Sequence, residues 1–384
     1  MRRAWWVWLL VGPVLVFNLR LHRVPGDPDL SRQLVFLRGA LDRGEAQAMQ
    51  RLFPEGYFFS HLLVALTELE RVQDPADPRA TLALSAAARA HQALTSPQGT
   101  GIFSPELTPP YGIFYQGWLA WLEVEQLRLG GTSSAAVDRR LDAIAFAFSD
   151  QGPFLEAYPG QSWPCDNVVA LAALSARDRL LPPRYAEVRR AWIEALRAEG
   201  ELLPHQARPA ASPPRGSSQS LIQRFLPVID SEWAAQAYPA FRRRLVTTRL
   251  GLPGVVEHEG GGGLGDVDSG PLLLGVSMSA TVVGLAAARA HGDRPLAQAL
   301  AGTMEAFGWP IGFSEKRYAL GLVPVGDAFV AWAYGTPEAP PQEVQDNLHF
   351  TTAPIHGLST LLLLIPLAWS WRRRTPPQVT PAQL

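Results

Sequence analysis

Two acidic loops carry the side chains best suited to chemistry. Residues 265–271 hold Asp266 and Asp268 in a glycine-rich turn ahead of an apolar segment. Asp166 follows Trp163 in a second acidic and aromatic loop, again ahead of an apolar segment. A carboxyl group among apolar neighbours stays protonated as a general acid, while a second carboxylate stays ionised. We therefore predict Asp166, Asp266 and Asp268 as catalytic groups, with Asp166 facing one of the other two.

The same aspartates also have a structural interpretation. Asp268 or Ser269 followed by Pro271 fits the start of a helix, because an oxygen side chain caps free N–H groups and proline suits the first turn. Asp166 beside Asn167 fits the same pattern. One acid of the glycine-rich loop is expected to cap a helix, which leaves the other for catalysis.

Aromatic residues near predicted helix starts are candidates for binding a substrate. Trp163 would offer a flat face to a sugar ring or an isoprenoid. Tyr57, Tyr111 and Tyr115 would line the same cleft, although core packing explains most aromatic residues at such positions. Glu257 lies in a Glu-His-Glu sequence, for which no third residue at a recognised spacing completes a metal site. We predict a solvated loop here, with Glu257 as its one substrate-binding residue.

The single cysteine, Cys165, stands at one of these helix starts. A helix N-terminus lowers the pKa of a thiol and favours a nucleophilic thiolate. The neighbouring charge of Asp166 opposes this effect, so a small packing residue is the alternative. One cysteine allows no disulfide within the chain.

Common cofactor motifs are absent or incomplete. Lys316, the only lysine, lacks the glycines of a phosphate-binding loop. Gly260, Gly262 and Gly265 have dinucleotide-site spacing, but no strand is predicted before them. Residues 275–279 lack the last glycine of a nucleophile elbow, and no His-Glu-x-x-His sequence occurs. We expect neither a cofactor nor a metal.

Charge and length narrow the class of protein. The chain has 384 residues and a formal net charge of −1, without a long basic run before its C-terminal end. Nucleic acid is therefore not an expected partner, because binding to phosphates needs clustered positive charge. The length fits one large domain or two ordinary ones.

Helical spacing of apolar residues runs through the middle of the chain. The predicted helices cover residues 30–50, 58–71, 78–94, 114–129, 134–148, 168–176, 183–198, 218–225, 231–247, 271–290, 295–307 and 325–334. No sheet is expected, apart from a possible small strand at 320–325.

The predicted helices alternate between two types. One type follows a long loop and is apolar on most faces, and the other follows a short turn and has a charged face. Buried inner and amphipathic outer helices in six pairs would form an all-α (α/α)6 toroid over residues 25–350. A right-handed superhelical solenoid is the alternative, although its repeat signature is missing.

Both ends of the chain are apolar. Residues 4–17 follow two arginines, and residues 355–371 precede three. These runs predict an N-terminal transmembrane anchor (1–24) and a C-terminal transmembrane helix with a short cytoplasmic tail (351–384). The toroid would then lie outside the cytoplasmic (inner) membrane. A removed signal peptide and a buried C-terminal helix are the alternatives.

Three motifs carry a resemblance to a known group. They are Arg-Gly-Ser-Ser-Gln-Ser from Arg215, Phe-Leu-Pro-Val-Ile-Asp from Phe225 and Gly-Asp-Val-Asp-Ser-Gly-Pro from Gly265. They resemble uncharacterised bacterial (α/α)6-toroid membrane proteins over about residues 50–335. More remotely, the chain is similar to linalool dehydratase-isomerase-like and six-hairpin glycosidase-like folds. Linalool dehydratase-isomerase uses paired cysteines, whereas this chain has only Cys165.

Together these features predict a membrane-anchored extracytoplasmic enzyme that acts on a glycan by carboxylate acid–base catalysis, as a hydrolase or a lyase. Two alternatives stay open. One is a linalool dehydratase-isomerase-like lyase acting on a terpenoid or lipid. The other is an envelope protein that binds a glycan or lipid without catalysis. The expected partners are a glycan or an amphiphilic small molecule, and the membrane.

Overall fold

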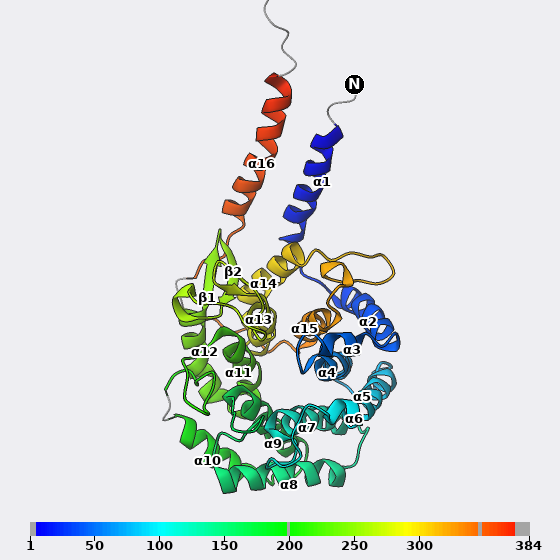
Figure 1. The fold of residues 1–384 in the computed structure, drawn as a ribbon, viewed down its shortest axis with the longest axis vertical. Helices are drawn as coiled ribbons and strands as arrows, with labels where there is room; N and C mark the ends of the chain where they lie inside the picture. Colours follow the sequence, from blue (N-terminus) through cyan, green and yellow to red (C-terminus); the bar gives the residue numbers. More distant parts are fainter. Residues whose placement is uncertain (1–4, 198–199, 345–347, 373–384) are drawn as a thin grey trace, which may run out of the picture.

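The computed structural model describes residues 5–197, 200–344 and 348–372. In this part of the chain the protein consists mainly of α-helices, as the apolar spacing predicts, with one small sheet. Most helices form a ring, from which two further helices project side by side (Figure 1).

Six helices form the inner wall of the ring. They are α4 (Gly56–Glu70), α7 (Gly112–Arg128), α9 (Pro164–Leu180), α11 (Gly216–Ile229), α13 (Met278–Ala290) and α15 (Pro324–Gly335). Each contacts the next in this order, and α15 contacts α4. The ring is therefore closed by its last and first inner helices.

A second set of helices surrounds the inner ones. It comprises α2 (Asp27–Asp42), α5 (Ala80–Leu94), α8 (Ser134–Gln151), α10 (Ala186–Arg197), α12 (Ser231–Leu245) and α14 (Arg294–Phe307), with the short α3 (Glu45–Gln50) and α6 (Pro97–Thr100) between them. Five of the six outer helices pack on the inner helix that precedes them, and α2 packs on α15. This alternation is consistent with the predicted α/α toroid.

Burial separates the two sets as their sequences predict. In α7 every residue from Gly112 to Gln126 is buried, because the helix packs on neighbours on all sides. In α10 only Trp192, Ile193 and Leu196 are buried, and the charged face lies in solvent.

A four-stranded antiparallel sheet lies between α12 and α13. Its order is β1 (Val246–Arg249), β2 (Leu252–Val256), β4 (Val276–Ser277) and β3 (Leu272–Leu273). The predicted helix at 271–290 is therefore wrong over its first turns. Leu274 and Gly275 have positive φ angles of 53° and 81°, which a helix does not tolerate, and Val276 pairs with Val256 instead.

Two smaller predictions also fail. The possible strand at 320–325 is a 3₁₀ turn, η2 (Ala319–Gly321), followed by the start of α15. The helix predicted at 30–50 is divided into α2 and α3, because Gly44 adopts a left-handed conformation with φ of 74°. A second 3₁₀ turn, η1 (Glu259–Gly261), lies in the glycine-rich segment.

The two projecting helices are α1 (Trp5–Arg20) and α16 (Ala353–Arg372), which contact each other. Ser359 Oγ donates a hydrogen bond of 3.0 Å to Asn18 Oδ1 between them. Among the described residues no helix is both long and apolar enough to cross a membrane, so the two predicted transmembrane helices lack support there. The outer arginines of the prediction at 2–3 and 373–374 lie outside the described residues.

Candidate active site

A cavity of about 1010 Å³ lies at one mouth of the ring. All six inner helices contribute residues near their starts to its wall: Phe59, Phe114, Asp166, Ser218, Met278 and Val325. The inner helices are therefore parallel, with all of their N-terminal ends at this mouth. Each N-terminus carries partial positive charge, which favours acidic groups beside it.

The structure brings the predicted acids together at this mouth. Asp166, Asp266 and Asp268 all line the cavity, and Trp163 lies beside them. The two loops meet because each precedes an inner helix and the inner helices begin at the same end.

Asp166 is a buried carboxyl group in the first turn of α9. Only 7% of the residue is exposed, and the N-cap of α9 is Trp163, so Asp166 is not the cap. Burial raises the pKa of Asp166 well above its usual value, and the charges of Glu55 and Asp268 raise it further. The neutral, protonated form is therefore favoured, as a general acid requires.

Asp266 behaves in the opposite way. Its Oδ1 accepts hydrogen bonds from the backbone N–H groups of Asp268 (3.1 Å) and Ser269 (3.0 Å), and its Oδ2 lies 2.6 Å from Arg215 Nη2. Partial burial raises the pKa of Asp266, but the Ser269 N–H and the Arg215 pair outweigh it and lower the pKa overall. Asp266 is therefore an ionised carboxylate that shapes the loop.

Asp268 lies between these extremes. Its side chain keeps an open face to solvent, but it lies in the recess of the mouth and close to other acids. Desolvation in this recess, and then the charge of Asp266, raise its pKa to about 6. Near neutral pH Asp268 is ionised but close to its pKa, which suits a general base.

The prediction that Asp266 or Asp268 caps the helix after this loop is wrong. The N-cap of α13 is Ser277, whose Oγ accepts the Ala280 N–H at 3.1 Å. Asp266 instead caps a turn within the loop, and Asp268 is not a cap of α13.

Three tyrosines predicted to bind substrate do not line the cavity. Tyr57 is buried against the His61 ring (centroids 4.6 Å apart), and Tyr111 packs on Tyr115. The Tyr115 hydroxyl donates to the Leu94 carbonyl at 3.3 Å in the core. Core packing, the alternative for these aromatic residues, is what the structure shows.

Glu257 also lies behind the cavity wall. It is fully buried and accepts hydrogen bonds of 2.7 Å from Arg215 Nε and from Ser217 Oγ. Arg215 in turn pairs with Asp266, so Glu257 positions the guanidinium that holds Asp266 ionised.

Four acidic or phenolic residues of the wall were not predicted: Glu55, Tyr158, Tyr318 and Asp327. Tyr158 donates a hydrogen bond to Glu55, and both line the cavity near Asp166. Asp327, in the first turn of α15, accepts the Tyr318 N–H at 2.8 Å, and burial raises its pKa to about 7. The sequence does place Glu55 and Asp327 close to the starts of inner helices, and this position is the feature that marks them as candidates.

Two potential nucleophiles or bases are held neutral. Burial and the charge of Asp166 raise the pKa of Cys165 well above its usual value, so the thiol does not supply a nucleophilic thiolate. Burial, followed by the charge of Arg215, lowers the pKa of His205 to about 4. Arg215 Nη1 lies 3.2 Å from His205 Nε2, which must accept because a guanidinium only donates.

Most of the cavity wall beyond the acids is apolar. Its apolar residues include Leu52, Phe53, Phe59, Phe114, Trp118, Leu221, Met278, Val282, Val283, Met304, Val325, Phe329 and Val330. In the described residues no group of three or more His, Cys, Asp or Glu side chains is placed to hold a metal ion. The mouth thus combines a few acids with a large apolar surface.

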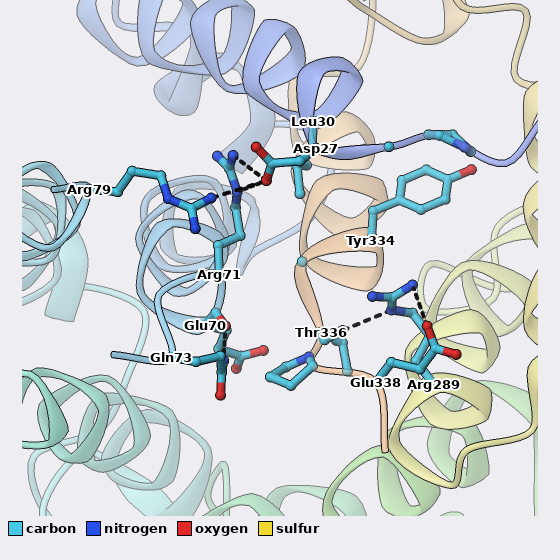
Figure 2. A pocket seen from close by; sticks show the side chains of 14 residues that line it. Asp27, Leu30, Glu70, Arg71, Gln73, Arg79, Arg289, Tyr334, Thr336 and Glu338 are labelled. Atoms are coloured by element: carbon cyan, nitrogen blue, oxygen red, sulfur yellow. Dashed lines mark hydrogen bonds and ion pairs between the residues drawn. The ribbon is translucent and has the colours of Figure 1, made fainter. Parts of the chain in front are cut away.

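A second cavity of about 820 Å³ lies at the C-terminal ends of α4, α13 and α15 (Figure 2). Its arginines pair with acids: Arg71 lies 2.7 Å from Asp27, and Arg289 lies 3.8 Å from Glu338. Cations at helix C-termini stabilise the helix dipole. These arginines therefore have a structural role, and the candidate chemistry lies at the opposite mouth.

A scan against protein-family models and a search of curated proteins found no match for this chain.

Proposed function

We propose that the protein is an acid–base enzyme whose cavity binds an amphiphilic alcohol, such as a terpenoid or lipid-like molecule, and eliminates or rearranges its hydroxyl group. The observation that supports this most is the contrast between Asp166, whose environment favours the protonated form, and the ionised carboxylates beside it. The apolar wall suits the hydrocarbon part of such a molecule.

The reaction would begin with the protonated Asp166. It donates its proton to the hydroxyl oxygen, the C–O bond breaks and water leaves. The Asp268 carboxylate removes a proton from the adjacent carbon, and the electron pair of that C–H bond forms the C=C bond. The proton then returns from Asp268 to Asp166 through the released water, so the net products are an alkene and water.

The aromatic part of the wall would assist this step. Phe59, Phe114 and Trp118 line the cavity, and Phe59 lies 5.6 Å from Trp118 in an edge-to-face pair. Faces of aromatic rings attract cations, so they would stabilise positive charge that develops on carbon as the hydroxyl leaves. An apolar wall also excludes bulk water from that carbon.

Hydrolysis of a glycan is the second candidate. Trp163 lies beside Asp166, and its ring packs edge-on against Tyr158 with centroids 6.1 Å apart. A flat aromatic face next to a protonated carboxyl group suits a sugar ring and its glycosidic oxygen. The apolar remainder of the wall favours the alcohol.

The location that fits this proposal is a membrane surface. The exposed residues Leu15, Leu19, Leu361 and Leu362 give the projecting α1–α16 pair an apolar outer face, although no described helix is long and apolar enough to cross a bilayer. We propose that this pair attaches the protein to a bilayer, with the ring on the extracytoplasmic side. Such attachment would bring the cavity close to lipid-soluble substrates.

Purified full-length protein can be incubated with linear isoprenoid alcohols and, separately, with oligosaccharides. Alkene formation is followed by gas chromatography and sugar release by reducing-end assay. Asp166→Asn should lower the rate by about 10²-fold or more, because it removes the general acid. Asp150→Asn, an exposed acid at the end of α8, is the matched control and should leave the rate unchanged.

The outcomes separate the candidates. Alkene formation that depends on Asp166 supports the proposed reaction, and sugar release that depends on Asp166 supports the glycan candidate instead. Full activity of Asp166→Asn would rule out the assigned general acid. Turnover of neither substrate class, with either compound retained on the protein, would favour a binding function.

A further inference from the structure

The segment between α14 and α15 exposes unusually large apolar side chains. Phe313 is 99% exposed and Leu322 is 73% exposed, and Leu320 also lies in solvent. Exposed apolar groups of this size on one segment are typical of a surface that contacts a partner or a membrane. We call residues 309–323 the rim segment.

The rim segment is held in place from beneath. The Lys316 ammonium lies 2.7 Å from Glu305 of α14 in the core, and the Lys316 N–H donates to the Arg32 carbonyl. Arg32 Nη1 donates to the Phe313 carbonyl at 3.0 Å, next to the most exposed side chain. The apolar side chains are therefore presented by a fixed backbone.

The rim segment lies at the end of the molecule from which α1 and α16 project. In Figure 1 it forms the yellow to orange loop beside the base of α1. The guanidinium carbon of Arg20, the last residue of α1, lies 4.9 Å from the centre of the Trp309 ring.

A second apolar tip flanks the same end. The β1–β2 turn carries Leu250, which is half-exposed, and Gly251 accepts the Thr351 N–H at 3.0 Å just before α16. Phe313 and Leu250 thus belong to segments that lie on either side of the two projecting helices (Figure 1).

Positive charge accompanies these apolar groups. Arg23 and Arg32 both pair with the same carboxylate, Asp29, so one guanidinium charge is left over. Arg20 at the base of α1 adds a further cation, hydrogen-bonded to the Pro310 carbonyl. Apolar side chains beside basic ones suit a bilayer with anionic headgroups.

The inner side of the rim segment forms part of the cavity wall. Tyr318, Ala319 and Val323 line the cavity, whereas Phe313 and Leu320 point into solvent. The segment therefore separates the cavity from the end that bears α1 and α16.

We propose that the rim segment and the β1–β2 turn dock on an anionic lipid bilayer, with Phe313 inserted among the acyl chains and the mouth held close to the membrane surface. This inference rests on the membrane attachment proposed above, and it does not depend on the reaction. It names the surface that would set how the ring is oriented on the membrane.

The test places an environment-sensitive nitrobenzoxadiazole label on full-length protein through Phe313→Cys in a Cys165→Ala background. The matched control is Phe146→Cys in the same background, because Phe146 is 66% exposed on α8, at the end of the ring far from α1 (Figure 1). Both proteins are mixed with phosphatidylcholine vesicles that contain phosphatidylglycerol, with or without brominated acyl chains. Flotation is measured on the same samples.

The label at 313 should shift its emission to the blue and be quenched by brominated lipid, whereas the label at 146 should show neither effect. Vesicles without phosphatidylglycerol should give a smaller shift. A protein that floats while its 313 label behaves like the 146 label would overturn the docking surface and leave the attachment through α1 and α16 intact. A protein that does not float would overturn both, and the alcohol reaction would still be tested by its own assay.

Discussion

Three aspartates of one mouth show how surroundings decide the chemistry of a residue. Burial near other acids raises the pKa of Asp166, whereas two backbone N–H groups and a guanidinium lower the pKa of Asp266. Asp268 lies between them, with its pKa near 6. The division into acid and base therefore follows from burial and hydrogen bonding rather than from residue type.

This contrast predicts opposite pH dependences for two variants. The pKa of Asp268 is raised from 3.8 to about 6 on folding, so its ionisation makes the free energy of unfolding fall as pH rises through that window. Asp268→Asn removes this loss, and the variant should gain stability relative to wild type above about pH 6. Urea unfolding at about pH 4 and about pH 7 measures the difference.

Asp266→Asn is the matched comparison in the same loop. Folding lowers the pKa of Asp266, so its stabilising contribution is present above its unfolded pKa and is lost as pH falls through its folded pKa. This variant should therefore be less stable than wild type near neutral pH, by up to about 1 kcal/mol for a partly exposed pair, and the gap should narrow in acid. The same sign of change for both variants would contradict the assignment of the two carboxyl groups.

The sequence was sufficient to place the acidic loops at one mouth, but not to identify every group there. The alternation of apolar and amphipathic helices predicts a ring with parallel inner helices. Asp166 and Asp268 then lie at the same mouth, because each belongs to a loop or first turn at the start of an inner helix. Glu55 and Asp327 are also close to helix starts, but a sequence does not show which of such residues turn inward. The substrate-binding role predicted for Tyr115 is wrong because its hydroxyl donates to the Leu94 carbonyl in the core. Only folding brings these two groups together.

At the scale of elements, the structure confirms most of the predicted helices but differs from the prediction in the segments that connect them. The helices followed from apolar spacing, whereas β3 and β4 occupy a stretch that carries apolar residues and lacks a strand pattern. Leu274 and Gly275 form the two-residue turn of the β3–β4 hairpin, and such a turn requires positive φ angles at both positions. The course of the rim segment likewise depends on contacts with other elements, among them Lys316 with Glu305 of α14 and Arg32 of α2 with the Phe313 carbonyl.

Lys316 should therefore control the stability of the rim segment. Its side chain is 5% exposed and its Glu305 partner is fully buried, so Lys316→Met would leave a buried carboxylate without its cation. Loss of one partner of a buried pair costs about 3–5 kcal/mol, which urea unfolding would measure. Adding Glu305→Gln should recover part of the loss, because the uncompensated charge is then removed.

Arg190→Met is the control for this prediction, since Arg190 and Glu187 form a pair on the solvent-exposed face of α10. It should change the free energy of unfolding by less than about 0.5 kcal/mol. If Lys316→Met were as mild as Arg190→Met, the rim segment would not depend on the buried pair.

At the scale of the whole molecule, one carboxylate connects four of the six inner helices. Glu70 of α4 accepts from Trp121 of α7 (3.1 Å), from Trp332 of α15 (3.3 Å) and from Arg224 of α11 (2.7 Å). The contact with α15 lies where the ring closes on α4. The buried Glu70 carboxylate thus joins these four helices, in addition to their apolar packing.

Glu70→Gln tests whether this group holds the ring together. Glutamine keeps the size and an acceptor for both indole groups, but Arg224, only 5% exposed, would lose its counter-charge. We expect a loss of about 3–5 kcal/mol in the free energy of unfolding. Hydrogen exchange should rise together in α4, α7, α11 and α15, since all four contact the altered group. Glu201→Gln, which alters an exposed pair with Arg243, should change neither quantity. Faster exchange confined to α4 would mean that apolar packing alone closes the ring.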